Sequence, residues 1–238
     1  ILSLANVYYS QEIRMYSMYL LLSSLSVWAM IGYFITPKKR YFLVNIIVNI
    51  LLVWTHLMSA AFLLLQAIMM VWHCRKNYKA IFLWGMPQAI NVAIWWGVWM
   101  RFMDFEKINI ASRWRYALKW DLESLLMGWS RMLSGATWSV YAYGVWIGVV
   151  SAVLVFFAVL AFLWRSYKSK KINSEAAFIL SLALLPIAFF FFSKVCVPLW
   201  QPRYTLYSQL GILLAMVMGT RVFTRRVQPV ILLMVMLL

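Results

Sequence analysis

Long apolar runs separated by short polar and basic stretches make up most of this chain. Runs of about 17–25 apolar residues cross a bilayer as helices, because a backbone surrounded by lipid must satisfy its own hydrogen bonds. The pattern therefore predicts an all-α fold, a polytopic transmembrane helical bundle that forms a single transmembrane domain over residues 1–238. The apolar runs cover residues 17–36, 41–72, 80–99, 137–164, 174–193 and 206–220, and a further run begins at residue 227.

Four clusters of basic residues orient the predicted helices. Loops rich in Lys and Arg stay on the cytoplasmic side of a membrane, and only Glu175 brings an acid near any of the clusters. We therefore expect all four clusters on the cytoplasmic side. They are Lys38-Lys39-Arg40, then Arg75-Lys76 with Lys79, then Arg165 with Lys168, Lys170 and Lys171, and finally Arg221 with Arg225 and Arg226.

Two clusters on the same side must be joined by an even number of crossings. Residues 41–72 are therefore expected to form a tight hairpin of two short helices that turns near Thr55–Ser59, in preference to one long tilted helix. Each of the other runs crosses once, and residues 17–36 run inward from an external start. The expected topology has about seven spans plus a truncated eighth.

The expected external loop, residues 101–136, contains apolar residues at steps of three and four with charged residues between them. This spacing predicts an amphipathic interfacial helix that lies on the outer membrane surface. A helix packed on the protein would show the same spacing, and the sequence favours neither alternative. The apolar positions are Trp114, Leu118, Leu122, Leu125, Trp129 and Met132.

The composition narrows the class of protein. Hydrophobic residues make up 65% of the chain and charged residues 12%, whereas a soluble domain has about 25% charged residues, so a water-soluble enzyme and a disordered chain are both excluded. The net charge of +16 fits cytoplasmic loops that meet anionic membrane lipid better than it fits nucleic acid, which is not expected as a partner. The two cysteines, Cys74 and Cys196, are expected on opposite sides of the membrane and therefore cannot pair.

The ends of the chain suggest a piece of a longer protein. The sequence starts at Ile1 inside an apolar stretch without an initiating Met, and it stops at Leu238 in an apolar run too short to span a bilayer. No nucleotide-phosphate loop, glycine-rich fingerprint or zinc-protease motif occurs in it. Candidate chemistry must therefore come from polar residues beside the predicted helices.

One polar group precedes the first complete predicted span. Residues 10–16 read Ser-Gln-Glu-Ile-Arg-Met-Tyr and place Glu12 and Arg14 at the external mouth of a helix. Both side chains reach water there, so they can serve either as interfacial anchors or as the charged lip of an external active site.

A second polar group lies on the predicted hairpin. Asn45, Asn49 and His56 are spaced so that they share one face of a helix. Polar groups inside a membrane face the bundle or a cavity. We expect interhelical hydrogen bonding for the two asparagines. His56, at the external tip, is either a structural residue or a metal ligand or acid–base group.

A third polar group, Pro198 to Tyr204, lies on the external side between two predicted spans. Two prolines in this stretch give a rigid, non-helical turn that holds Arg203 at the lip of a helix. A guanidinium at such a place suits an anionic ligand such as a phosphate, and it suits a lipid head-group anchor equally well.

The three groups together resemble a known family. Residues 8–16 (Tyr-Tyr-Ser-Gln-Glu-Ile-Arg-Met-Tyr), residues 53–56 (Val-Trp-Thr-His) and residues 202–204 (Pro-Arg-Tyr) are similar, in the same order, to conserved segments of bacterial GT-C glycosyltransferases. These are membrane proteins related to the dolichyl-phosphate-mannose protein mannosyltransferases and to the lipid A aminoarabinose transferase. The resemblance covers most of the chain and is thin between residues 80 and 190.

The resemblance implies an inverting transfer of a sugar from a polyprenyl-phosphate carrier to an acceptor on the outer, periplasmic face of the bacterial inner (plasma) membrane. It implies that Arg14 and Arg203 bind the phosphate of the donor. The catalytic Asp of the family lies in a loop that precedes this chain, so no catalytic residue is named and this chain alone is expected to be inactive. The resemblance also implies that a divalent cation is held by Glu12 and His56. The implied cavity lining is Gln11, Glu12, Tyr16 and Tyr204.

Two other functions are compatible with a chain that has many apolar membrane spans. A transporter or flippase for lipid-linked sugars would carry paired inverted repeats and charged groups at mid-membrane. A non-catalytic scaffold subunit would not need its polar residues gathered on one side of the membrane. The predicted polar groups all lie on the external side, which favours an enzyme with an outward-facing site. The sugar and the acceptor are not defined by the sequence.

Overall fold

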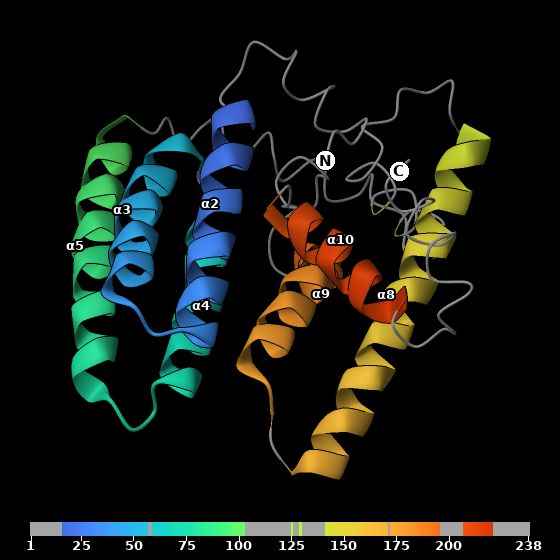
Figure 1. The fold of residues 1–238 in the computed structure, drawn as a ribbon. Helices are drawn as coiled ribbons and strands as arrows, with labels where there is room; N and C mark the ends of the chain where they lie inside the picture. Colours follow the sequence, from blue (N-terminus) through green and yellow to red (C-terminus); the bar gives the residue numbers. More distant parts are fainter. Residues whose placement is uncertain are drawn as a thin grey trace. The chain divides into compact units, whose positions relative to one another are not determined.

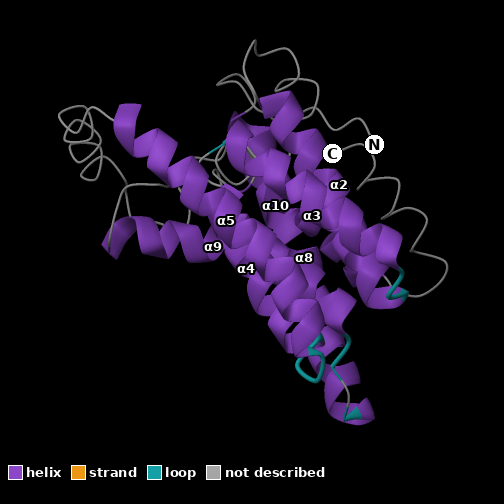
Figure 2. Cartoon of the chain, turned by 90° about the vertical axis from the view of Figure 1, so that its left-hand side faces the viewer, coloured by secondary structure: helices purple, strands orange, loops and turns teal. Residues whose placement is uncertain are grey.

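The protein is seen here in a computed structural model that describes residues 16–56, 59–102, 125, 129, 141–170, 172–195 and 207–220. Every secondary-structure element in these ranges is an α-helix (Figure 2), so the predicted all-α fold is confirmed for this part of the chain. The chain divides into two compact units. The N-terminal unit is Arg14–Phe105, and the C-terminal unit combines Ile1–Ile13 with Glu106–Leu238.

The N-terminal unit contains four helices packed side by side (Figure 1). They are α2 (Tyr16–Ile35), α3 (Lys39–Thr55), α4 (Ser59–His73) and α5 (Tyr78–Phe102). Helix α3 contacts each of the other three and so forms the centre of the unit. The predicted hairpin over residues 41–72 is confirmed: α3 ends at Thr55, and α4 begins at Ser59, whose backbone N–H donates to the carbonyl of His56 at 3.0 Å.

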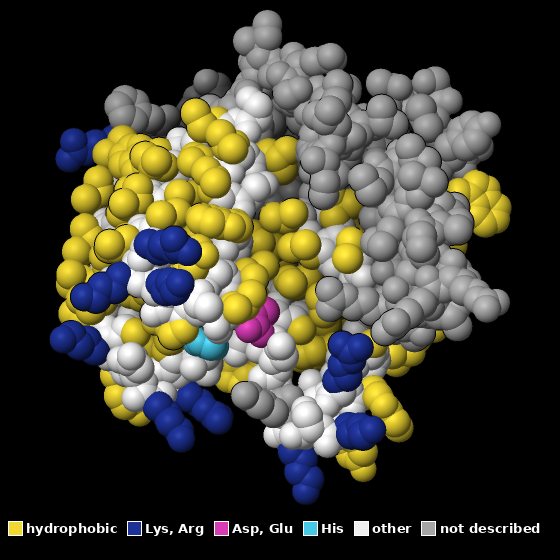
Figure 3. Space-filling model, viewed as in Figure 1, with side chains coloured by type: hydrophobic (Ala, Val, Ile, Leu, Met, Phe, Trp, Pro, Cys, Tyr) yellow, Lys and Arg dark blue, Asp and Glu magenta, His cyan; other side chains and the backbone are white. Residues whose placement is uncertain are grey.

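The hairpin brings two basic clusters to the same end of the N-terminal unit. Lys38 to Arg40 follow α2, and Arg75 with Lys76 follows α4, which runs in the same direction as α2 in Figure 1. Figure 3 shows most Lys and Arg side chains of this unit from its middle to its lower end, with a hydrophobic surface above them and one basic group at its upper edge. This arrangement agrees with the even number of crossings that the charge pattern requires.

The C-terminal unit is built from α8 (Tyr141–Ser169), α9 (Ser174–Val195) and α10 (Tyr207–Thr220). Helix α10 packs against both α8 and α9 (Figure 1). Lys170, with a φ of 51°, lies in the left-handed region just after α8 and ends that helix before the turn into α9. The core of this unit is apolar and includes Leu154, Val155, Ala158, Leu180, Ala183, Ile212 and Met216.

Two glycines allow α10 to approach its neighbours closely. A Cβ at Gly219 would collide with the backbone carbonyl of Leu154 on α8, and a Cβ at Gly211 would lie 2.8 Å from the Leu182 side chain on α9. Small residues at such contacts are typical of helices that associate within a membrane. Backbone contact at these glycines therefore determines how the three helices fit together.

Three described helical segments are long and apolar enough to cross a membrane: Ser17–Ile35, Tyr78–Val98 and Gly148–Ser169. The predicted count of seven spans is not supported. Helices α3, α4 and α10 have 17, 15 and 14 residues, fewer than the roughly 20 that a 30 Å hydrocarbon core requires. Large apolar side chains such as those of Trp28, Phe82 and Ile90 are more than half exposed, which is typical of lipid-facing positions in a membrane protein.

The predicted interfacial helix within residues 101–136 lies mostly outside the described residues. Of its apolar positions, the structure describes Leu125 and Trp129, both in helical conformation. Trp129 is 3% exposed and belongs to the core of the C-terminal unit, and Leu125 packs against that core. At these two positions the apolar side chains therefore face the protein, which agrees with a helix packed on the protein.

Candidate functional site

The external site predicted from the sequence is described at two positions. Tyr16 is the first residue of α2, and His56 directly follows α3. The other five predicted site residues lie outside the described residues. They are Gln11, Glu12, Arg14, Arg203 and Tyr204.

His56 leaves the helix and lies against α2. Its backbone is extended, with φ −157° and ψ 135°, so the helical stripe expected through Asn45, Asn49 and His56 stops before the histidine. The imidazole ring instead stacks on the ring of Tyr19, with 4.9 Å between centroids and 24° between planes. Tyr19 is fully buried and lies one turn after Tyr16. The hairpin tip is thus fixed beside the first turns of α2.

Two hydroxyl groups fix the turn that carries His56. The Thr55 hydroxyl donates to the carbonyl of Leu52 at 2.7 Å, and the Ser59 hydroxyl donates to the same carbonyl at 2.8 Å. Carbonyls at the end of a helix lack partners within the helix, so these two bonds satisfy one of them and tie the start of α4 to the end of α3. The position of His56 is therefore set by the local sequence as well as by stacking.

No group of three or more His, Cys, Asp or Glu side chains suited to a metal ion occurs among the described residues. The divalent cation implied by the sequence would need Glu12, which lies outside them. A single histidine contributes at most one nitrogen ligand, which is too few to hold a cation by itself. The cation site therefore stays a prediction.

The most extensive polar site in the described residues is a network inside the N-terminal unit. Asn45 donates to the Ser26 carbonyl at 3.0 Å and to Gln66 Oε1 at 3.0 Å, and it accepts from the indole nitrogen of Trp84 at 2.7 Å. Asn45 is 1% exposed. These three partners lie on α2, α4 and α5, so one side chain of α3 is bonded to all three neighbouring helices.

Asn49 and Ser26 complete this network. The Ser26 hydroxyl donates to Asn49 Oδ1 at 2.6 Å, and Asn49 donates to Gln66 Oε1 at 2.9 Å. Gln66 in turn donates to the Ser26 hydroxyl at 2.7 Å. The interhelical hydrogen bonding expected for Asn45 and Asn49 is confirmed.

A second set of bonds continues along α5. Gln88 and Asn91 follow Trp84 on the same face of the helix and donate to the α3 carbonyls of Ile46 and Ile50 at 3.2 Å. Trp54 donates to Asn91 Oδ1 at 3.0 Å. The groups in this network are neutral and bond mainly to one another, which suits fixed helix positions rather than proton or ion transfer.

A buried thiol lies at the basic end of the N-terminal unit. Cys74, directly after α4, has its Sγ 3.9 Å from the Tyr33 hydroxyl and is 8% exposed. Burial raises the pKa of this thiol, while the hydrogen bond between Cys74 and Tyr33 acts in the opposite direction. A thiol with a raised pKa is a weak nucleophile at neutral pH, so Cys74 has the properties of a packing residue.

No family model, no curated protein and no solved structure matches the chain.

Proposed function

We propose that the chain is part of a GT-C membrane glycosyltransferase, which moves a sugar from a polyprenyl-phosphate carrier to an acceptor on the external face of the bacterial plasma membrane. The observation that carries the proposal is the stacking of His56 on Tyr19. The family-like segment at residues 53–56 ends with this histidine, and the family-like segment at residues 8–16 leads into α2, where Tyr19 lies.

The stacking brings the end of the family-like segment at residues 53–56 close to the helix that follows the segment at residues 8–16. Residues 16 and 56 are 40 positions apart in the sequence, yet the hairpin tip contacts the first turns of α2. An enzyme site that uses both segments requires this proximity, whereas two chance similarities do not. The basic clusters lie at the other end of the same unit, which supports an external location for His56 by the positive-inside rule.

The proposed reaction needs no prosthetic group. An acceptor oxygen attacks the anomeric carbon of the donor sugar, the bond from that carbon to the carrier phosphate breaks, and the phosphate leaves with an additional negative charge. Arg14 and Arg203 stabilise that charge, and a carboxylate general base accepts the proton of the acceptor. The residues that we assign to the sugar in this proposal are Gln11, Glu12, Tyr16 and Tyr204. A divalent cation, if bound, would be held by His56 and Glu12 and would add positive charge beside the leaving phosphate.

The proposed topology keeps seven crossings, with α3 and α4 as a short pair whose tip reaches the external surface. Short helices in such a pair can be accommodated because their polar groups bond within the unit instead of facing lipid.

The buried polar groups favour an enzyme over a transporter. A carrier of lipid-linked sugars is expected to hold charged groups at mid-membrane. The buried polar side chains among the described residues are serines, asparagines and glutamines, without a buried charge. Most of those in the N-terminal unit also bond to one another or to backbone carbonyls, which leaves few of them to bind a moving substrate.

The direct test is turnover of a polyprenyl-phosphate sugar by the complete protein in liposomes. Arg14→Ala and Arg203→Ala should each lower the rate by about 30- to 1,000-fold, because each removes a charge-assisted bond worth roughly 2–4 kcal/mol in the transition state. Arg→Lys at either position should restore only part of the rate, because a point charge replaces a two-pronged donor.

Arg40→Ala is the matched control. Arg40 is exposed at the basic end of the N-terminal unit, in the first turn of α3, and its loss should leave the rate unchanged at equal expression. Wild-type turnover by both Arg14→Ala and Arg203→Ala would identify these arginines as head-group anchors. Absence of turnover by the wild-type protein with any polyprenyl-phosphate sugar would refute the proposed function.

A further inference from the structure

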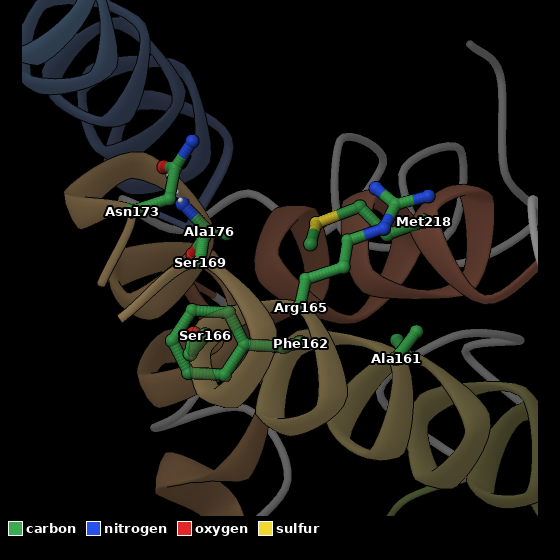
Figure 4. A pocket seen from close by; sticks show the side chains of 9 residues that line it. Ala161, Phe162, Arg165, Ser166, Ser169, Asn173, Ala176 and Met218 are labelled. Carbon is green, nitrogen blue, oxygen red and sulfur yellow. Dashed lines mark hydrogen bonds between the residues drawn. The ribbon is translucent and has the colours of Figure 1, made fainter. Parts of the chain in front are cut away.

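The C-terminal unit contains a cavity of about 220 Å³ where α8 turns into α9. All three helices of the unit contribute to it, and Figure 4 shows the lining side chains. The volume is below the roughly 300–1,000 Å³ of pockets that enclose a whole drug-sized ligand, so it suits a head group rather than a complete lipid or nucleotide. The lining residues used below are Phe162, Arg165, Ser166, Ser169, Asn173 and Met218.

Arg165 gives the cavity a positive charge. Its side chain extends from α8 toward Met218 of α10 in Figure 4. Lys168, Lys170 and Lys171 follow within six residues of the sequence, and the nearest acid, Glu175, does not line the cavity. A guanidinium in such a basic segment of the sequence attracts a phosphate and can bind it through two parallel hydrogen bonds.

Neutral polar side chains line the cavity from the last turn of α8 and from the turn into α9. Ser166 and Ser169 carry hydroxyl groups, and Asn173 carries an amide. Asn173 also caps α9: its Oδ1 accepts the backbone N–H of Ala176 at 3.0 Å, which orients the side chain at the helix N-terminus. The positive end of the α9 dipole therefore points toward the same region.

The cavity also has an apolar wall, formed by Phe162, Met218 and alanines of α8 and α9. Nearby on α8, Trp164 and Tyr167 are 68% and 83% exposed. Exposed Trp and Tyr at the end of an apolar helix, next to basic residues, are typical of the depth at which lipid head groups lie. A ligand at this depth can place its phosphate on Arg165 and its chains beside apolar surface.

We propose that this cavity binds the phosphate of an anionic phospholipid, with Arg165 as its charge partner and Phe162 and Met218 beside the start of the acyl chains. Membrane proteins bind anionic head groups in basic pockets between helices on the side where positive loops gather. This proposal uses none of the residues assigned to sugar transfer and does not depend on the proposed function. Those residues are Gln11, Glu12, Arg14, Tyr16, His56, Arg203 and Tyr204.

The test measures lipid binding by the complete protein in detergent, with native mass spectrometry across a range of phosphatidylglycerol concentrations. Arg165→Gln should weaken binding by about 30- to 100-fold, because it removes a charged hydrogen-bonding partner. Phosphatidylcholine, which has no net charge, should bind the wild-type protein no better than it binds this variant. Wild-type affinity of Arg165→Gln for phosphatidylglycerol would overturn the proposal.

Lys170→Gly is the matched control for general attraction to positive charge. Lys170 does not line the cavity, and glycine accepts its left-handed backbone, so the turn is kept while one charge is lost. Binding should fall about fivefold at most, the effect of one basic residue near an anionic surface. Equal losses in Lys170→Gly and Arg165→Gln would contradict a defined pocket.

A final arm separates the two sources of phosphate. Inorganic phosphate at millimolar concentration should compete only weakly with phosphatidylglycerol, because it lacks chains that contact Phe162 and Met218. Phe162→Ala should therefore weaken lipid binding and leave phosphate binding unchanged. Complete displacement of the lipid by inorganic phosphate would contradict a lipid ligand.

Discussion

The two units of this protein hold their helices together by different means. In the N-terminal unit, Asn45 and Gln66 join all four helices through buried amide hydrogen bonds. In the C-terminal unit, the core is apolar and α10 approaches its neighbours at Gly211 and Gly219. The two units therefore show the two main ways in which membrane helices associate without a hydrophobic driving force between them: hydrogen bonding and close backbone packing.

The two units also differ in where their polar side chains and candidate sites lie. The N-terminal unit uses most of its buried polar groups within its own network, and its proposed chemistry lies at the hairpin tip, where His56 stacks on Tyr19. The C-terminal unit concentrates polar and charged side chains at one end, around the cavity with Arg165. In both units the positions expected to meet a ligand lie at helix ends, where polar groups can also reach water.

The largest expected effect is on the close packing of the C-terminal unit. Gly219→Ala should lower the free energy of unfolding by about 3 kcal/mol, because the added Cβ collides with the Leu154 carbonyl and α10 must move away from α8. Thermal unfolding in detergent measures the change. The matched control is Gly97→Ala in α5, where nothing lies within 4 Å of the new Cβ, and it should be neutral or stabilising by about 0.5–1 kcal/mol. Equal stability of the two variants would show that the glycine contact is unimportant.

The next effect concerns the amide network of the N-terminal unit. Gln66→Leu should lower the free energy of unfolding by about 2 kcal/mol, because Asn45, Asn49 and Ser26 each lose a partner while they stay buried. Chemical unfolding of the complete protein in mixed micelles gives the value. An unchanged or higher stability would mean that these amides find other partners and that the network does not hold the unit together.

Two buried serines allow the difference between the units to be tested with the same substitution. Ser26 donates to Asn49 and accepts from Gln66, whereas the Ser208 hydroxyl in α10 has no hydrogen-bond partner among the described residues. Ser26→Ala should lower the free energy of unfolding by about 1 kcal/mol, and Ser208→Ala should change it by less than about 0.5 kcal/mol. An equal loss of unfolding free energy in Ser208→Ala and Ser26→Ala would contradict the proposed difference between the two units.

The smallest expected effect is on the reactivity of Cys74, measured in a Cys196→Ser background. Because burial raises the pKa of the Cys74 thiol, its thiolate fraction at neutral pH is reduced, and alkylation by iodoacetamide should keep accelerating at a pH above the roughly 8.5 of a free cysteine. Tyr33→Phe removes a hydrogen bond that lowers this pKa, so labelling at pH 8 should slow by about two- to fivefold. Labelling profiles that match those of the unfolded protein would contradict this packing of the basic end.

The sequence predicted the positions of the helices better than it predicted the contacts between them. Apolar run length and the basic clusters were enough to locate all seven described helices and the hairpin turn between α3 and α4. They were not enough to count membrane spans, because α3, α4 and α10 are apolar but short. A run of apolar residues indicates that a helix is buried in lipid or in protein. It does not indicate how far the helix extends across the bilayer.

The polar sites were predicted only in part, for a physical reason. Asn45 and Asn49 were found because two polar residues four apart share one helix face. Gln66 is a single amide in the apolar helix α4, whereas Trp84 shares one face of α5 with Gln88 and Asn91. The partners of Gln66 and Trp84 lie on other helices, so only the packed unit shows the network. The helical stripe was wrong at His56, because α3 ends at Thr55 and the histidine turns onto Tyr19 instead.

The most direct measurement of the proposed function compares two substitutions of His56 in the complete protein, with turnover of a polyprenyl-phosphate sugar as the readout. His56→Phe keeps an aromatic ring that can stack on Tyr19 and removes both ring nitrogens, whereas His56→Ala removes the stacking as well. If His56 takes part in sugar transfer, both variants should lose turnover by about 100-fold or more, and His56→Phe should keep wild-type stability. Full turnover by His56→Phe, with loss only in His56→Ala, would make His56 a packing residue and would contradict its place in the proposed site.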